Sequence, residues 1–131
     1  MTMKWLKQTI TALLCIFVLV SCEYEFIEIA TPEPPDPNDT TVDTVFFATQ
    51  IEPLFTSNGC TDCHKSGNFF NLTAGNAYKS IMDNDAVDLA DPPSSEIYVK
   101  PLPTGSHFKK YANADEANLV LTWIYQGALD N

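Results

Sequence analysis

The five residues 60–64 of this chain, Cys-Thr-Asp-Cys-His, constrain its fold more than any other feature of the sequence. Two thiols three positions apart on a turn can reach one edge of a flat ligand, and the adjacent imidazole then comes up beneath its centre. Gly59 precedes them and leaves the backbone free to turn tightly. The pattern is typical of covalent haem attachment, so we predict one haem c bonded to Cys60 and Cys63, with His64 as the proximal iron ligand.

Two other chemistries use closely spaced cysteines. A thioredoxin-like pair requires a strand–helix–strand context, and the chain shows no convincing strand alternation. A structural zinc ion requires four ligands, which Cys60, Cys63, His64 and His107 would supply. Zinc is therefore the competing interpretation. The predicted signal peptide and the predicted helices on both sides of the motif, both described below, favour haem.

Residues 1–21 have the pattern of a secretory signal peptide. Lys4 and Lys7 precede an apolar run over 10–20, which is shorter than the roughly 20 residues that span a bilayer. Leu-Val-Ser-Cys at 19–22 is similar to a lipobox. That resemblance implies cleavage before Cys22, a diacylglyceryl thioether on its sulfur and fatty acylation, such as palmitate, of the new terminus. Several acyl chains give stable anchoring to a membrane.

Residues 22–44 are predicted to be the lipidated cysteine and a disordered tether, because the proline- and acid-rich run at 31–37 suits an extended linker. The predicted location is the bacterial cell envelope, on the outer membrane and facing the periplasm or the surface. Removing 1–21 takes away two of the seven basic residues and none of the 17 acidic ones, so the formal charge falls from −10 to −12. Such a charge argues against a nucleic-acid partner.

The predicted folded domain covers 45–131 and begins with two helices. The first runs from Val45 to about Phe55, and Pro53 is expected to kink or end it. The second begins after Thr73 as N-cap and carries Met82 on its apolar face.

Two further helical segments complete the domain. Ser94 or Ser95 is expected to cap a short turn that runs through Val99. Asn113, with a glutamate three residues later, is a capping-box-like start for the last helix, and Gly127 suits its end. We therefore predict an all-α fold. Side chains expected to pack on haem are Phe55, Phe69, Phe70, Tyr78, Leu102 and Trp123, and a carbonyl of Pro92 or Pro93 is expected to bond His64.

The segment 47–131 resembles the small cytochrome c modules of Bacteroidota lipoproteins and the planctomycete-type cytochrome c domain. The matching features are Ile-Glu-Pro at 51–53, the haem motif, Leu-Thr-Ala at 72–74, Ser-Ser-Glu-Ile at 94–97 and Trp-Ile-Tyr-Gln-Gly-Ala at 123–128. The resemblance implies the cytochrome c fold, with three to four short helices around one haem. It also implies that the first and last helices pack crosswise.

The chain departs from that family where a Met-Pro pair commonly supplies the sixth iron ligand. Leu102-Pro103 stands there instead, and leucine cannot coordinate. His107 lies 43 residues after His64, far enough for a loop to return across the opposite haem face. Met82 is the runner-up, and an open sixth position is the third possibility. Bis-histidine ligation would lower the potential relative to histidine–methionine ligation.

The expected function is one-electron transfer by a membrane-anchored c-type cytochrome, which turns over no substrate of its own and is therefore not an enzyme. Its partners would be redox donor and acceptor proteins of the envelope. It would act as a monomer or as a module of a larger complex. The alternative is a haem-based small-ligand sensor or a peroxidase-like site with an open sixth position on the iron.

Overall fold

The computed structural model describes residues 3, 36 and 41–131. The predicted signal peptide, the lipidated Cys22 and most of the predicted linker therefore lie outside the described residues. The chain divides into two units, 1–30 and 31–131, and the second contains the fold discussed below. Within the described residues, no helix is long and apolar enough to cross a membrane.

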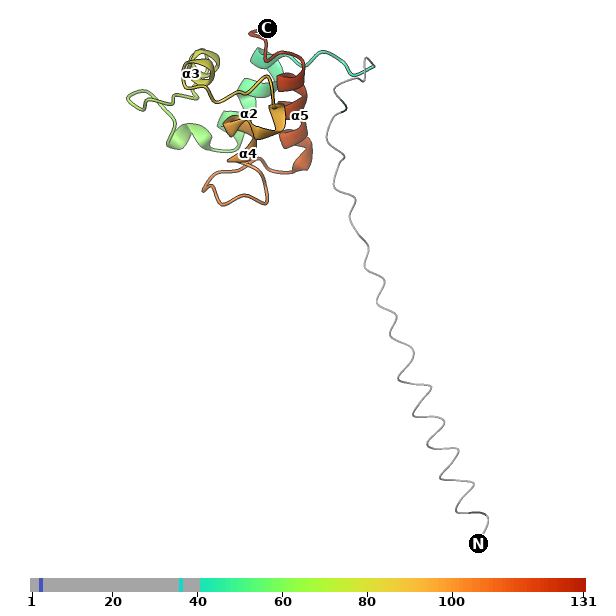
Figure 1. Cartoon of the computed structure of the whole chain (residues 1–131). Helices are drawn as coiled ribbons and strands as arrows, with labels where there is room; N and C mark the ends of the chain where they lie inside the picture. Colours follow the sequence, from blue (N-terminus) through green and yellow to red (C-terminus); the bar gives the residue numbers. More distant parts are fainter. Residues whose placement is uncertain (1–2, 4–35, 37–40) are drawn as a thin grey trace. The chain divides into compact units, whose positions relative to one another are not determined.

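The described part of the second unit is helical and contains no strand, which confirms the all-α prediction at this level (Figure 1). Four α-helices and three short helical turns follow one another along the chain. In order they are η1 (Phe47–Ile51), α2 (Glu52–Ser57), η2 (Cys60–Asp62), α3 (Ala77–Asp83), η3 (Pro92–Ser94), α4 (Glu96–Val99) and α5 (Ala114–Tyr125).

Pro53 begins a helix instead of ending one, so the prediction for this proline was wrong. The chain makes a π-helical turn, η1, which closes with a hydrogen bond from the Glu52 amide to the Phe47 carbonyl. Pro53 follows in the first turn of α2. The first amides of an α-helix have no partner within it, so a residue without an N–H costs little there.

The second predicted helix starts one turn later than expected. Thr73 does not cap it; its carbonyl accepts the amides of Asn76 and Ala77 in a preceding turn. The helix α3 begins at Ala77 because Gly75 has a φ of +76°, in the left-handed region that an α-helix cannot contain.

Ser95 stands at the start of α4, as predicted, but its side chain does not cap the helix. The hydroxyl is buried and accepts the amide of Asp88 at 2.9 Å. This bond holds the loop between α3 and η3 against α4. The Ile97 amide adds a second tie by donating to the Ala86 carbonyl at 3.0 Å.

The last helix forms as the sequence predicts. Asn113 Oδ1 accepts the amide of Glu116 at 2.9 Å, which satisfies one of the free donors of the first turn. At the other end Gly127 has a φ of +97° and donates its amide to Ile124, while the Ala128 amide reaches the Trp123 carbonyl. These two bonds form a Schellman motif, which satisfies the last carbonyls of α5.

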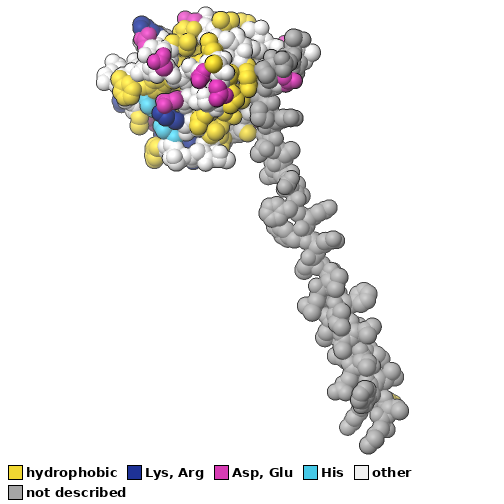
Figure 2. Space-filling view, in the orientation of Figure 1, with side chains coloured by type: hydrophobic (Ala, Val, Ile, Leu, Met, Phe, Trp, Pro, Cys, Tyr) yellow, Lys and Arg dark blue, Asp and Glu magenta, His cyan; other side chains and the backbone are white. Residues whose placement is uncertain are grey.

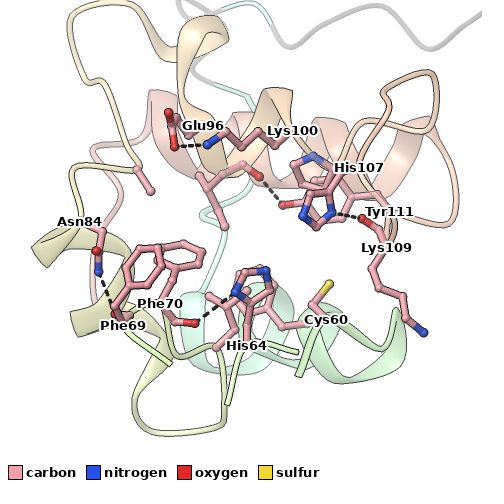
Figure 3. Close-up of a pocket in the computed structure, with 15 residues that line it drawn as sticks. Cys60, His64, Phe69, Phe70, Asn84, Glu96, Lys100, His107, Lys109 and Tyr111 are labelled. Carbon is pink, nitrogen blue, oxygen red and sulfur yellow. Dashed lines mark hydrogen bonds and ion pairs between the residues drawn. The ribbon is translucent and has the colours of Figure 1, made fainter. Parts of the chain in front are cut away.

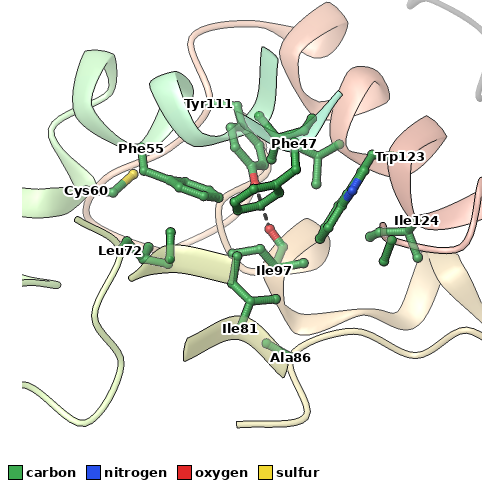
Figure 4. Close-up of a cluster of buried hydrophobic side chains, with 14 of the residues drawn as sticks. Phe47, Phe55, Cys60, Leu72, Ile81, Ala86, Ile97, Tyr111, Trp123 and Ile124 are labelled. Carbon is green, nitrogen blue, oxygen red and sulfur yellow. Dashed lines mark hydrogen bonds between the residues drawn. The ribbon is translucent and has the colours of Figure 1, made fainter. Parts of the chain in front are cut away.

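The buried face of α5 contacts the first turn of the domain (Figure 4). The rings of Phe47 and Trp123 have centroids 5.1 Å apart, and Tyr78 packs edge-on against Phe47 at 5.3 Å. The C-terminus closes the contact, since the Ala48 amide donates to the Asn131 carbonyl. Other core side chains are Ile51, Phe55, Leu72, Ile81, Ile97, Ala117, Val120, Leu121 and Ile124.

Candidate functional site

A pocket of about 390 Å³ opens beside this core, within the size range of cofactor sites. His64 lies at one side and His107 at the other, with Cys60 at the edge between them and the Phe69 and Phe70 rings opposite (Figure 3). The residues that line it are Phe55, Cys60, His64, Phe69, Phe70, Leu72, Asn84, Ala86, Glu96, Ile97, Lys100, Pro101, His107, Lys109 and Tyr111.

The turn at residues 60–64, called the attachment turn below because the sequence predicts haem attachment there, brings Cys60 and His64 into this pocket. Gly59 has a φ of +67°, which reverses the chain after α2 and starts the 3-10 turn η2. The His64 amide then donates to the Cys60 carbonyl at 2.9 Å. The prediction of a tight turn at Gly59 is confirmed, because only a residue without a Cβ adopts this conformation at low cost.

A backbone carbonyl orients His64. Nδ1 of the ring lies 3.1 Å from the carbonyl oxygen of Phe70, and the Phe70 ring packs edge-on at a centroid distance of 5.3 Å. Because the carbonyl can only accept, Nδ1 carries the proton and Nε2 of the neutral ring keeps a lone pair for a metal. The prediction that Pro92 or Pro93 bonds His64 was wrong. Both prolines lie in η3, and the loop after the motif supplies the carbonyl instead.

His107 is oriented in the same way from the other side. Its Nδ1 lies 2.7 Å from the carbonyl oxygen of Lys109, so Nε2 is again left with the lone pair. The base of this loop is held shut by the Tyr111 amide, which donates to the Pro101 carbonyl at 2.9 Å. The Tyr111 hydroxyl also donates to the Ile97 carbonyl at 2.7 Å.

The two imidazole rings lie 6.1 Å apart between centroids, with their planes 18° apart. The chain has two histidines in all, so the histidine colour in Figure 2 marks the mouth of this pocket, beside lysine and acidic side chains. When Nε2 of two imidazoles points at one metal ion from opposite sides, two bonds of about 2 Å, each with about 1 Å more from the nitrogen to the ring centre, separate the ring centres by roughly 6 Å. The spacing of His64 and His107 therefore fits one metal ion between them.

Few other candidate metal ligands gather at this pocket in the described residues. Among the described residues no group of three or more His, Cys, Asp or Glu side chains is arranged to hold a metal ion. The four-ligand zinc arrangement of Cys60, Cys63, His64 and His107 is therefore not formed in the described domain. Two histidines alone could hold only a metal whose remaining ligands come from a bound group.

The two cysteines differ in their surroundings. Cys60 is buried at the pocket edge, whereas Cys63 is exposed and does not line the pocket. Burial raises the pKa of the Cys60 thiol, and the Cys60 backbone hydrogen bond and the charge of Lys109 offset part of this. Both thiols are free, and no disulfide joins them.

The other predicted residues divide into two groups. Phe55, Phe69 and Phe70 line the pocket, whereas Tyr78, Leu102 and Trp123 do not. Met82 packs half-buried against the core and lies outside the pocket lining as well. No pattern in the sequence indicated Lys100, Lys109 and Tyr111, which reach the pocket from the loop between α4 and α5.

No protein-family model matches this chain, and neither a curated protein nor a solved structure is significantly similar to it.

Proposed function

We propose that this protein is a c-type cytochrome that carries single electrons at a bacterial cell envelope. One observation carries the proposal: His64 of a C-x-x-C-H turn and His107 lie 6.1 Å apart across one pocket. In this proposal Cys60 and Cys63 would hold haem c through thioethers, and His64 and His107 would bind its iron. The fold would then be that of a cytochrome c domain.

The chemistry supplied by the bound haem is the reversible change of its iron between the ferric and ferrous states. The protein's contribution is to hold both imidazoles by Nδ1, with the carbonyls of Phe70 and Lys109 as acceptors. Each such bond makes the opposite nitrogen a stronger donor, which favours the ferric state and lowers the potential. Because both imidazoles are already held in place, little rearrangement of the protein would accompany the gain or loss of an electron.

Apolar walls make the pocket suitable for a porphyrin. Phe55, Leu72 and Ile97 come from the core and exclude water from one side. Phe69 is exposed at the mouth, so one edge of a bound macrocycle would stay close to the surface. An electron could then pass to a partner protein without the haem leaving the site. The partners in this proposal are redox proteins of the envelope, and the anchor is lipid on Cys22.

The test is expression of the mature chain, from Cys22, in a host with haem-maturation machinery. We expect a red protein whose haem stays attached after denaturation, with a low-spin spectrum in both oxidation states. His107→Ala should convert the spectrum to high spin, whereas Met82→Leu, the matched control at the other candidate ligand, should leave it unchanged. A colourless protein would contradict the proposal, and retention of zinc would favour the competing metal site.

The sensor or peroxidase-like alternative predicts a different result from the same preparation. An open sixth position would give a high-spin wild type that binds carbon monoxide without a lag. The presence of His107 across the pocket, with its Nδ1 already bonded, favours the closed, electron-carrying form.

A further inference from the structure

Lys109 contacts both sides of the pocket. Its carbonyl accepts the Nδ1 proton of His107 at 2.7 Å, and its ammonium Nζ lies 3.2 Å from Oδ2 of Asp62. Asp62 stands between the two cysteines of the attachment turn. A single residue therefore links the loop that carries His107 to the turn that carries His64, along the side of the pocket where Figure 3 draws its side chain.

Gly59 leaves the space that this ion pair occupies. A Cβ at this position would lie 2.8 Å from Nζ of Lys109 and 3.1 Å from Oδ2 of Asp62. The first distance is shorter than side-chain carbons adopt, so any other residue would require the Lys109 ammonium, at the end of a flexible side chain, to shift. The glycine that permits the tight turn thus also allows the lysine to approach it.

The neighbouring lysines make no such link. Nζ of Lys110 lies 3.5 Å from the Pro103 carbonyl, within its own loop. Lys100 pairs with Glu96 one turn earlier on α4. Of these three lysines of the described domain, only Lys109 forms an ion pair that crosses from the histidine loop to the attachment turn.

We propose that Lys109 is a positioning residue that holds the His107 loop closed on the attachment turn, and that ionic strength thereby controls the access of small ligands to the site. This inference rests on the proposed haem function. The side chains of Lys109 and Asp62 are 32% and 67% exposed, so the pair is modest in strength and screened by salt. It makes loop opening rarer without preventing it.

The test measures how fast carbon monoxide binds to the reduced holoprotein, because the gas must wait until His107 leaves the iron. Asp62→Asn and Lys109→Met remove the ion pair and keep the backbone carbonyl that bonds His107. Each should accelerate binding by about two- to fivefold, the range expected of an exposed ion pair. Lys110→Met changes the net charge in the same way as Lys109→Met and is its matched control, for which the rate should stay at the wild-type value.

The dependence of the carbon monoxide binding rate on salt distinguishes this role of Lys109 from a merely structural one. Raising the ionic strength from about 0.01 M to about 0.5 M should accelerate binding in the wild type and in Lys110→Met. In Asp62→Asn and Lys109→Met the rate of carbon monoxide binding should change little with ionic strength. The reversed pair, Asp62→Lys with Lys109→Asp, should restore slow binding. Faster hydrogen exchange of the amides of 104–110 in Asp62→Asn should report the same opening without any added ligand.

The failures of the two proposals are distinguishable. A protein without covalent haem, or an unchanged spectrum in His107→Ala, overturns the proposed ligation and this inference together. Covalent haem with equal rates in Asp62→Asn, Lys109→Met and Lys110→Met overturns the inference alone and leaves the electron-transfer proposal standing.

Discussion

His64 and His107 face each other across one pocket, with ring centroids 6.1 Å apart and with Nδ1 of each ring bonded to a backbone carbonyl. The two histidines reach this arrangement from different local structures. His64 follows a 3-10 turn, whereas His107 lies on a loop whose ends are tied by the Tyr111–Pro101 hydrogen bond. In each ring the hydrogen bond from Nδ1 to a backbone carbonyl fixes the same tautomer. This is the form that donates to a metal through Nε2.

Asn68 is predicted to tune the His64 side of this pair. Its Nδ2 donates to the Cys63 carbonyl at 3.2 Å, and its Oδ1 accepts the Phe70 amide at 3.0 Å. Asn68→Ala should loosen the loop that presents the Phe70 carbonyl to His64. A weaker bond at Nδ1 makes the imidazole a poorer donor, so in the haem-bound protein that we propose the midpoint potential should rise by on the order of tens of millivolts.

A potentiometric titration of the holoprotein checks this prediction. Asn76→Ala is the control, because the side chain of Asn76 bonds only to Thr73 and Ala74, before α3. An equal shift in both variants would mean that the change does not act through His64.

The N-cap of α5 should contribute measurably to stability. Asn113→Ala removes the acceptor of the Glu116 amide, and we expect the free energy of unfolding to fall by about 1 kcal/mol. Urea denaturation followed by far-ultraviolet circular dichroism measures it. Asn76→Ala serves again as the comparison, since Asn76 precedes α3 without a side-chain cap bond. A loss no larger at Asn113 than at Asn76 would contradict the capping argument.

Gly127 should tolerate asparagine better than alanine. Its φ of +97° is strained for any side chain, but a Cβ there would meet nothing closer than Leu129 Cδ2 at 3.9 Å. The cost of Gly127→Ala is therefore backbone strain alone, about 1–2 kcal/mol. Gly127→Asn should lose less, because asparagine enters the left-handed region more readily. Thermal unfolding of the two variants, measured side by side, would refute this reasoning if their melting temperatures coincided.

The sequence predicted well those features that local residues determine. The cap of Asn113 and the stop at Gly127 both follow from short patterns, and both are confirmed. The starts of α2 and α3 were mispredicted because a π-helical turn before Pro53 and a left-handed Gly75 replace regular helix. Neither conformation has a periodicity that apolar residues reveal.

The candidate site was predictable only in part for a related reason. The motif indicates Cys60 and His64, and His107 is indicated because it is the other histidine of the chain. The orienting carbonyls of Phe70 and Lys109 belong to the backbone, which every residue possesses, so no residue type indicates them. The Lys109–Asp62 ion pair likewise depends on how a loop returns to the turn, and sequence spacing does not determine that.

Tyr111 provides the last prediction, on the dependence of stability on pH. Its hydroxyl is buried and donates to the Ile97 carbonyl at 2.7 Å. Burial raises the pKa of Tyr111 well above its ordinary range, since the phenolate would lie in an apolar surrounding, and the charges of Cys60 and Glu116 act in the same direction.

The sign follows from proton binding. Above about pH 10 the unfolded chain releases the Tyr111 proton while the folded chain keeps it, so the stabilisation is full below that pH and is lost as pH rises. Tyr111→Phe should remove this alkaline loss. At neutral pH it should cost about 1–3 kcal/mol, because the Ile97 carbonyl loses its partner. Urea denaturation at pH 7 and at about pH 11 measures both effects. Tyr125→Phe, at a half-buried tyrosine on α5, is the control. If it reduced the loss of stability between pH 7 and about pH 11 as much as Tyr111→Phe does, the effect would not arise from the buried hydroxyl.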